Sequence, residues 1–168
     1  MALILDADSL IKLNRVGALD LVARAFECVI PTAVYQEAVV NARARGYPDA
    51  ESIDNIVREL IPVQEVTPSE PSTTFTPFGP GEGEVLALAT QGHGESIIVS
   101  DDLVFLNAVR RTGIRYVTPI ALIPRLARIE AISVDGAREL LERSRRLTNE
   151  RNYLAALADL EVYENDDP

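Results

Sequence analysis

The chain has 168 residues, of which 47% are hydrophobic, and it carries a formal net charge of −10 at pH 7. This length and hydrophobic content suit one domain with a sizeable core. The sequence has neither a run of about 18 apolar residues nor a basic leader with a cleavage site, so it predicts a cytoplasmic protein without a membrane span. Cys28 is the only cysteine, which excludes an internal disulfide, and its apolar neighbours predict a buried thiol.

The surplus of negative charge is unevenly distributed along the chain. Residues 103–151 contain ten arginines and five acids, a local balance of +5 that leaves −15 elsewhere. Net negative charge disfavours contact with nucleic acid unless bound cations neutralise part of it. The arginine-rich stretch 138–146 predicts either an exposed helix face paired to Glu139 and Glu142 or a surface that contacts phosphates. The acidic tail, 161–168, is expected either to stay disordered or to cover that stretch.

Short apolar runs alternate with helical patterns along most of the chain. The run 2–5 is too short for an ordinary helix and predicts a buried strand that ends at Asp6, after which Asp8 or Ser9 is expected to cap a helix. The patterns that follow predict a helix at 18–26, a strand at 27–30, a helix at 33–44 capped by Thr32, a helix at 49–60, an edge strand at 62–66, a helix at 81–91, a strand at 96–100, a helix at 102–112 and a strand at 115–117.

This alternation predicts an α/β fold in three layers, with a short central parallel sheet flanked by helices. Residues 119–160 are expected to add C-terminal helices. The stretch 67–80 predicts a long irregular loop, in which Phe75 and Phe78 would either pack on the body or stack on a base. His93 is expected at a turn tip rather than as a base or a metal ligand.

Acidic residues recur where the predicted strands end and where helices begin. Asp6 follows the first buried strand, and Asp101 and Asp102 follow the strand at 96–100. Glu37 lies near the start of one helix, and two further glutamates, Glu82 and Glu84, open another. Each acid has an ordinary explanation alone, as a helix cap, as a partner of the helix dipole or as a solvated side chain. Gathered at one edge of a parallel sheet, however, they would repel one another unless divalent cations occupied the site.

Four segments carry a resemblance to a known family. They are 3–11 (LILDADSLI), 29–37 (VIPTAVYQE), 81–89 (GEGEVLALA) and 98–102 (IVSDD). In order and spacing they resemble the PIN-domain nucleases, and in particular the VapC-like branch of toxin ribonucleases. The similarity covers about residues 3–117 and weakens in the C-terminal helices. It implies a PIN-like domain over residues 1–147, with a terminal helix and acidic tail over 148–168.

The resemblance also implies a function and a set of site residues. The function is a Mg²⁺- or Mn²⁺-dependent endoribonuclease that hydrolyses RNA to 5′-phosphate and 3′-hydroxyl ends, with a small antitoxin and a second copy of the chain as partners. The family's acids fall on Asp6, Glu84 and Asp102 as metal ligands and on Glu37 as ligand or base, with Asp101 a further possible metal ligand. Two alternates are open, Asp8, where the family usually has Ser or Asn, and Glu82.

Two other classes fit part of the pattern. Asp6 and Asp8 after a strand are also similar to the first motif of haloacid-dehalogenase-type phosphatases. Those enzymes use a lysine well after the first acid, whereas the only lysine here is Lys12, and arginine is a poor substitute for a compact ammonium group. The second alternative is a PIN-like binding module without turnover, against which the sequence offers only its full set of acids.

Overall fold

The computed structural model describes residues 1–66, 78–92 and 95–166. The predicted loop lies largely outside this part of the chain, as do Phe75 and His93. The elements in chain order are β1 (Leu3–Leu5), α1 (Ala7–Val16), α2 (Leu19–Ala25), β2 (Cys28–Pro31), α3 (Thr32–Tyr35), η1 (Gln36–Asn41), α4 (Ala42–Ala44), α5 (Asp49–Leu60), β3 (Val63–Gln64), α6 (Pro80–Gln91), β4 (Ile97–Val99), α7 (Leu103–Thr112), β5 (Arg115–Val117), η2 (Pro119–Ala121), α8 (Leu122–Arg128), α9 (Val134–Ser144) and α10 (Glu150–Asp166).

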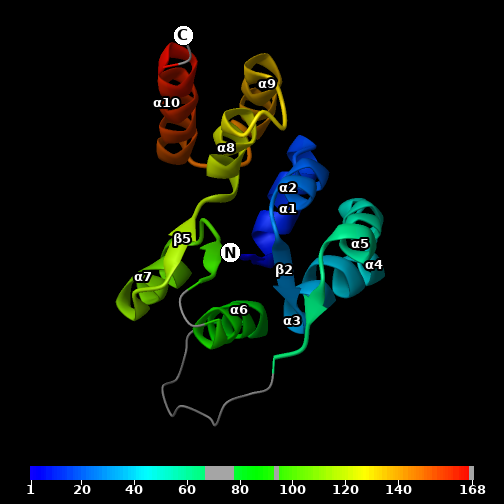
Figure 1. The fold of residues 1–168 in the computed structure, drawn as a ribbon. Coiled ribbons are helices and arrows are strands. Elements are labelled where there is room, and N and C mark those ends of the chain that lie inside the picture. Colours follow the sequence, from blue (N-terminus) through cyan, green and yellow to red (C-terminus); the bar gives the residue numbers. More distant parts are fainter. Residues whose placement is uncertain (67–77, 93–94, 167–168) are drawn as a thin grey trace.

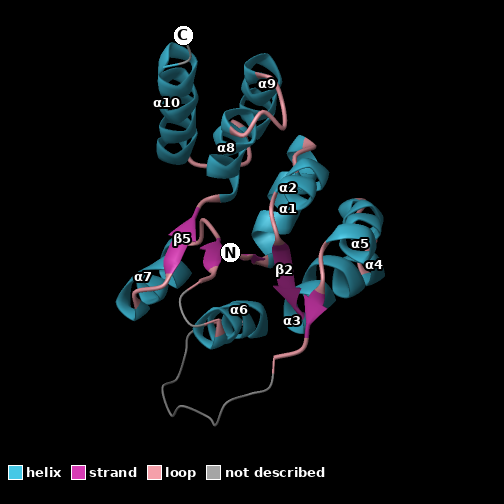
Figure 2. Ribbon diagram, viewed as in Figure 1, coloured by secondary structure: helices cyan, strands magenta, loops and turns pink. Residues whose placement is uncertain are grey.

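The five strands form one parallel sheet in the order β3-β2-β1-β4-β5 (Figure 2). The first strand is central, because the chain builds outward from β1 to β3 and then returns to add β4 and β5 on the other side. In register, Leu5 of β1 pairs with Val99 of β4. A reversal of this kind leaves a crevice at the carboxyl ends of the two strands where the direction changes, which here are β1 and β4.

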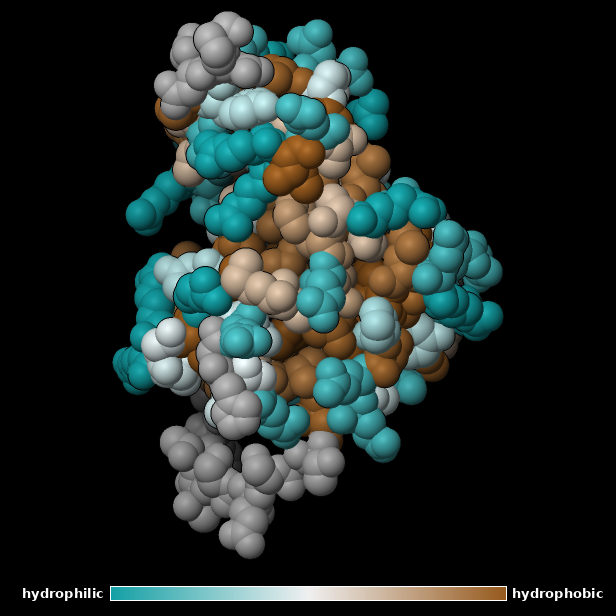
Figure 3. Space-filling view, in the orientation of Figure 1, coloured by the Kyte–Doolittle hydropathy of each residue, from teal (hydrophilic) through white to brown (hydrophobic). Residues whose placement is uncertain are grey.

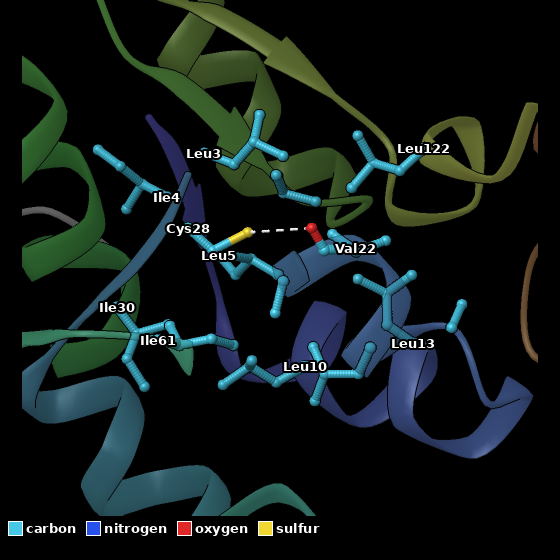
Figure 4. Packing of buried hydrophobic residues seen from close by; sticks show 14 of the residues in the cluster. Leu3, Ile4, Leu5, Leu10, Leu13, Val22, Cys28, Ile30, Ile61 and Leu122 are labelled. Carbon is cyan, nitrogen blue, oxygen red and sulfur yellow. Dashed lines mark hydrogen bonds between the residues drawn. The ribbon is translucent and has the colours of Figure 1, made fainter. Parts of the chain in front are cut away.

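Helices cover both faces of the sheet, as the sequence predicts. Figure 1 shows α6 and α7 on one side of the strands and α1, α2 and α5 on the other, with α8, α9 and α10 as a further helical group. The core is built from fully buried strand residues and the apolar faces of these helices (Figure 4). The Cys28 thiol lies in this core and donates to the carbonyl oxygen of Val22 at 3.9 Å. Burial raises the pKa of this thiol to about 12, so Cys28 acts as a small apolar residue.

Two local details differ from the sequence-based expectation. The cap of α1 is Asp6 rather than Asp8 or Ser9, since the Asp6 carboxylate accepts a hydrogen bond from the Ser9 backbone nitrogen at 2.7 Å. The helix predicted at 33–44 begins at Thr32, whose hydroxyl donates instead to the Gln64 carbonyl at 3.4 Å, and its middle part, η1, is a π-helix. Sequence patterns do not distinguish a π segment from an α-helix, because both place their apolar residues on one face.

The arginine-rich helices are paired within the chain. Arg143 of α9 and Arg145, which directly follows this helix, form ion pairs with Glu139 and Glu142, as expected for an exposed helix face. The helix α10 extends through most of the predicted acidic tail, and its Glu164 pairs with Arg138 at 2.7 Å. In Figure 3, hydrophobic residues gather in the middle of the face, where Figure 1 places the strands, and hydrophilic residues cover the helices around it.

The remaining features of the fold are the length of its helices and the packing of Phe78. Among the helices of the described ranges, none is long and apolar enough to span a membrane. Phe78 packs edge-on against Phe105 of α7, with ring centroids 5.5 Å apart. Its use is therefore packing on the body rather than an open stacking surface.

A buried carboxylate ties α5 to both flanks of the π-helix. Asp54 of α5 is 2% exposed and accepts hydrogen bonds from the Tyr35 hydroxyl at 2.8 Å, from Arg43 at 2.6 Å and from Arg58 at 3.0 Å. Tyr35 immediately precedes η1, and Arg43 follows it. The hydrogen bond from Arg43 is the main reason that the pKa of Asp54 is lowered, against the opposing effect of burial.

We predict that Asp54→Asn lowers the free energy of unfolding at pH 7 by about 1–3 kcal/mol, because three donors lose a charged acceptor. A carboxyl whose pKa is lowered by folding stabilises the protein above its unfolded pKa. The difference should therefore persist at neutral pH and disappear as the pH falls below about 4. Urea unfolding followed by circular dichroism across this pH range measures it.

The matched control is Glu51→Gln, which removes an exposed acid paired with the same Arg43 at 3.0 Å. Exposed pairs contribute about 0–1 kcal/mol. Equal losses in the two variants would contradict a special role for the buried carboxylate.

Candidate metal centre

The parallel register of β1 and β4 brings the first acids together. Because Leu5 lies opposite Val99, the residues that follow them, Asp6 and Ser100, leave the sheet side by side. The Asp6 backbone nitrogen still donates to the Val99 carbonyl at 3.3 Å, which fixes its position against β4. Asp102 lies two residues beyond Ser100, whose hydroxyl oxygen accepts a hydrogen bond from the Asp102 backbone nitrogen at 3.2 Å.

Asp6 is a buried carboxylate with a perturbed pKa. Its side chain is only 5% exposed, and this burial is the main cause that raises its pKa to about 6. Hydrogen bonding by Ser100 and Ser9 lowers the pKa in part, and the negative charge of Asp8 raises it further. The charged form of the Asp6 carboxylate is therefore destabilised at neutral pH unless a cation lies beside it.

The two aspartates after β4 have different environments. Asp102 caps α7 by accepting from the Phe105 backbone nitrogen at 2.7 Å, and it lines the same cavity as Asp6. Asp101 instead accepts a hydrogen bond from the ammonium group of Lys12 at 2.6 Å. Lys12 also lies 3.7 Å from Asp8, one helical turn before it. The lysine thus neutralises Asp101, whose side chain turns to α1.

Glu37 reaches the same cavity from the π-helix η1. π-Helical turns widen the backbone locally and are frequent at functional sites. Space beside Glu37 is provided by Gly81 of α6, where a β-carbon would lie 3.1 Å from a Glu37 carboxylate oxygen. Burial is the main cause that raises the pKa of Glu37, and the charges of Glu82 and Asp8 raise it further.

Only one of the two glutamates at the start of α6 lines the acidic cavity, although both line a larger cavity beside it. Glu82 lines the cavity with Asp6, Asp8, Glu37 and Asp102. Glu84, which the family resemblance places among the metal ligands, accepts a hydrogen bond from the Ala33 backbone nitrogen at 2.8 Å and lines a neighbouring, larger cavity. Residues two apart on a helix point about 200° apart, so one helix start can direct only one of the two into the acidic cavity. The geometry favours Glu82, the alternate, for that position.

Five carboxylates thus surround a cavity of about 50 Å³, which suits a small cation with water molecules. In the ranges that the structure describes, no three His, Cys, Asp or Glu side chains are already placed to hold a metal ion directly. Mg²⁺ typically binds one or two carboxylates and keeps several waters, so oxygen donors arranged around a small space are compatible with it. The donor chemistry and the raised carboxyl pKa values both fit a hard divalent cation.

A comparison with protein families identifies the domain. A family model described as PIN domain, DUF3368, matches residues 2–158. The chain belongs to the PIN domain family. Comparisons with curated proteins and with solved structures gave no match. PIN domains are typically nucleases and generally use divalent metal ions, and the α/β sheet flanked by helices agrees with the PIN fold.

Sequence reasoning missed the residues that position the PIN domain acids. Ser9 and Ser100 are fully buried around Asp6, and Lys12 holds Asp101 away from the cavity. The lysine left a signal, because it is the only one in the chain and lies four residues after Asp8. Ser9 was expected only as a helix cap, and nothing in the sequence marks Ser100, whose role follows from the strand register.

We predict that Asp6→Asn stabilises the metal-free protein at pH 8, by about 1–3 kcal/mol in EDTA. Asn caps a helix as well as Asp, so the variant removes the buried charge and keeps the cap. A carboxyl whose pKa is raised by folding destabilises the protein increasingly as the pH rises from about 4 to above 6. The gain should therefore vanish near pH 4, which urea unfolding at the two pH values measures.

The control is Asp8→Asn, at the rim of the same cavity, whose side chain is 70% exposed. It should stabilise the protein less. A gain for Asp6→Asn that is the same at pH 4 and pH 8 would show that burial of the charge is not its cause.

Proposed function

We propose that this PIN domain protein is a Mg²⁺- or Mn²⁺-dependent endoribonuclease, the toxin of a toxin–antitoxin pair. One observation carries the proposal. Carboxylates from four separate segments, the ends of β1 and β4, the π-helix η1 and the start of α6, line one small cavity. Their mutual repulsion has no structural benefit, which makes a site for divalent cations the best explanation of the arrangement.

Each acid has a role that follows from its surroundings. The buried Asp6 and the cap Asp102 would hold the metal from the two adjacent strand ends, and Glu82 would hold it from α6. A divalent ion there would lower the pKa of a water molecule and neutralise charge on the phosphodiester. Glu37, whose pKa is raised, would accept a proton from the attacking water, and hydrolysis would leave 5′-phosphate and 3′-hydroxyl ends.

The phosphatase alternative is disfavoured by the geometry. A nucleophilic aspartate must face open space for a phosphate, whereas Asp6 is 5% exposed and its carboxylate already caps α1. Lys12, the one lysine, pairs with Asp101 and Asp8 rather than with Asp6. A binding module without turnover is the outcome that the cleavage assay below would identify.

The proposal includes two protein partners, an antitoxin and a second copy of the chain. Beside the cavity, Leu103 and Val104 follow Asp102 and are 66% and 63% exposed. Exposed aliphatic side chains next to a catalytic acid suit an inhibitory peptide segment, which would cover them. Light scattering of the purified protein, alone and co-expressed with its neighbouring reading frame, tests both partners.

The proposed metal site predicts that divalent cations stabilise the protein against thermal unfolding. Mn²⁺ or Mg²⁺ at about a hundred times the dissociation constant should add roughly 2.7 kcal/mol and raise the Tm by about 5–10 °C. Asp102→Asn should lose most of this response, because Asn keeps the helix cap but removes a charged ligand. A wild-type Tm that does not respond to either ion would remove the basis of the proposal.

The proposed roles of the two glutamates of α6 predict different effects when each is replaced by glutamine. Glu82→Gln should reduce cleavage of a randomised single-stranded RNA by about 10²–10³-fold, because it removes a charge from the cavity. Glu84→Gln should retain most of the cleavage and instead lower the stability by about 1 kcal/mol, through a weaker cap on α3. Gel analysis of labelled RNA and urea unfolding measure the two effects.

The reverse pattern, with Glu84→Gln inactive and Glu82→Gln active, would return the ligand role to Glu84. A metal response without cleavage of any RNA would indicate a binding module.

A further inference from the structure

A second, larger cavity adjoins the acidic one. It has a volume of about 650 Å³, in the range of cavities that hold small ligands. Glu37, Gly81 and Glu82 line both cavities, so the two spaces share one wall. A substrate bound at the acids would therefore extend into this second space.

An exposed arginine lines the second cavity. This residue is Arg45, at the end of α4. Within the described part of the chain, no acid forms an ion pair with Arg45 and its side chain makes no hydrogen bond, whereas both arginines of α9, Arg138 and Arg143, are paired. Its charge acts on Glu37, whose pKa it lowers, so the guanidinium lies within electrostatic reach of the acidic cavity.

Two side-chain amides lie beside this arginine. Gln36 and Asn41, the first and last residues of the π-helix η1, both line the cavity. Neither side chain makes a hydrogen bond within the residues that the structure describes. An amide presents two donors and one acceptor group, which is the chemistry that reads the edge of an unpaired base.

We propose that this second cavity, lined by Gln36, Asn41 and Arg45, binds the nucleotide that adjoins the scissile phosphate of a single-stranded RNA. Arg45 binds its phosphate, and the two amides contact its base. The inference rests on the proposed nuclease function, and it adds the substrate subsite and the residues that select the base.

A cationic side chain at this subsite is needed for RNA binding because the chain has a net charge of −10. RNA approaching five carboxylates is repelled unless cations offset them. The metal offsets charge inside the small cavity, and Arg45 supplies a cation for the next phosphate along the strand. Guanidinium groups suit this role because they bind phosphate oxygens in pairs.

The test is RNA binding by the full chain in Ca²⁺, a hard cation with oxygen ligands that offsets the carboxylate charge, with each oligomer checked for intactness after the measurement. Fluorescence anisotropy of labelled single-stranded oligomers of A, C, G and U measures the affinity at several salt concentrations. Arg45→Gln should weaken binding about tenfold for every oligomer and reduce the slope of log K against log salt by about 0.7. Asn41→Ala should instead change the ratios of affinity among the four oligomers.

The control for Arg45 is Arg111→Gln, at the far end of α7 from Asp102. Arg111 is also exposed, so this variant has the same net charge as Arg45→Gln. Equal losses in the two variants, unchanged binding by Arg45→Gln, or no RNA binding by the wild type would overturn the phosphate contact. Unchanged affinity ratios for Asn41→Ala would overturn the base contact.

The failure of this subsite and the failure of the proposed function give different results. Cleavage by the wild type together with Arg45-independent binding removes only the subsite. Arg45-dependent binding without cleavage in Mn²⁺ or Mg²⁺ removes the catalytic function and retains the nucleotide site.

Discussion

The structure is organised around one unfavourable interaction, the mutual repulsion of the carboxylates at the carboxyl edge of β1 and β4. Asp6 is buried there because the register of β1 and β4 places it directly after the paired residues Leu5 and Val99. This burial raises its pKa to about 6. Several neighbouring features reduce the conflict without removing it. Ser9 and Ser100 surround the carboxylate with polar groups, and Lys12 takes Asp101 out of the group. What is left is a set of acids whose repulsion a divalent cation would relieve, so stability and function oppose each other at this edge of the sheet.

The rest of the fold holds that edge in place. Glu37 is carried by a π-helix, a conformation that is stable only when its surroundings support it. The support comes from Asp54, which binds Tyr35 before the π segment and Arg43 after it, and so anchors both ends of the segment to α5. From the other side, Gly81 allows α6 to approach within contact distance of the Glu37 carboxylate. The position of one glutamate thus depends on two helices and on a hydrogen-bond network far from the acids in sequence.

The sequence was sufficient for the fold and for part of the site. Every strand of the parallel sheet was predicted, the buried ones from short apolar runs, and with them the positions of Asp6 and Asp102 after two buried strands. That β1 and β4 are neighbours did not follow, because chain order alone does not fix the order of strands in a sheet. The choice between Glu82 and Glu84 did not follow, because it depends on the rotation of α6 about its axis, which is set by packing against β1, β2 and β4. The helix that carries Glu37 was predicted, but its π segment was not, since the segment is fixed by contacts with α5 that are distant in sequence.

The distribution of charge determines how this acidic chain can bind a polyanion such as RNA. The formal charge of −10 describes the whole surface, but contact with RNA depends on the few charges that its phosphates meet. In this chain both arginines of α9 and the nearby Arg128 and Arg145 are paired with acids of α9 and α10, which leaves them little charge to offer a phosphate. Arg45 differs because two of its neighbours in the cavity, Glu37 and Glu82, also line the proposed metal site. A cation bound in the acidic cavity would offset those two charges and leave Arg45 and Glu84 as the remaining fixed charges of the larger cavity, so metal binding and RNA binding should reinforce each other at this site.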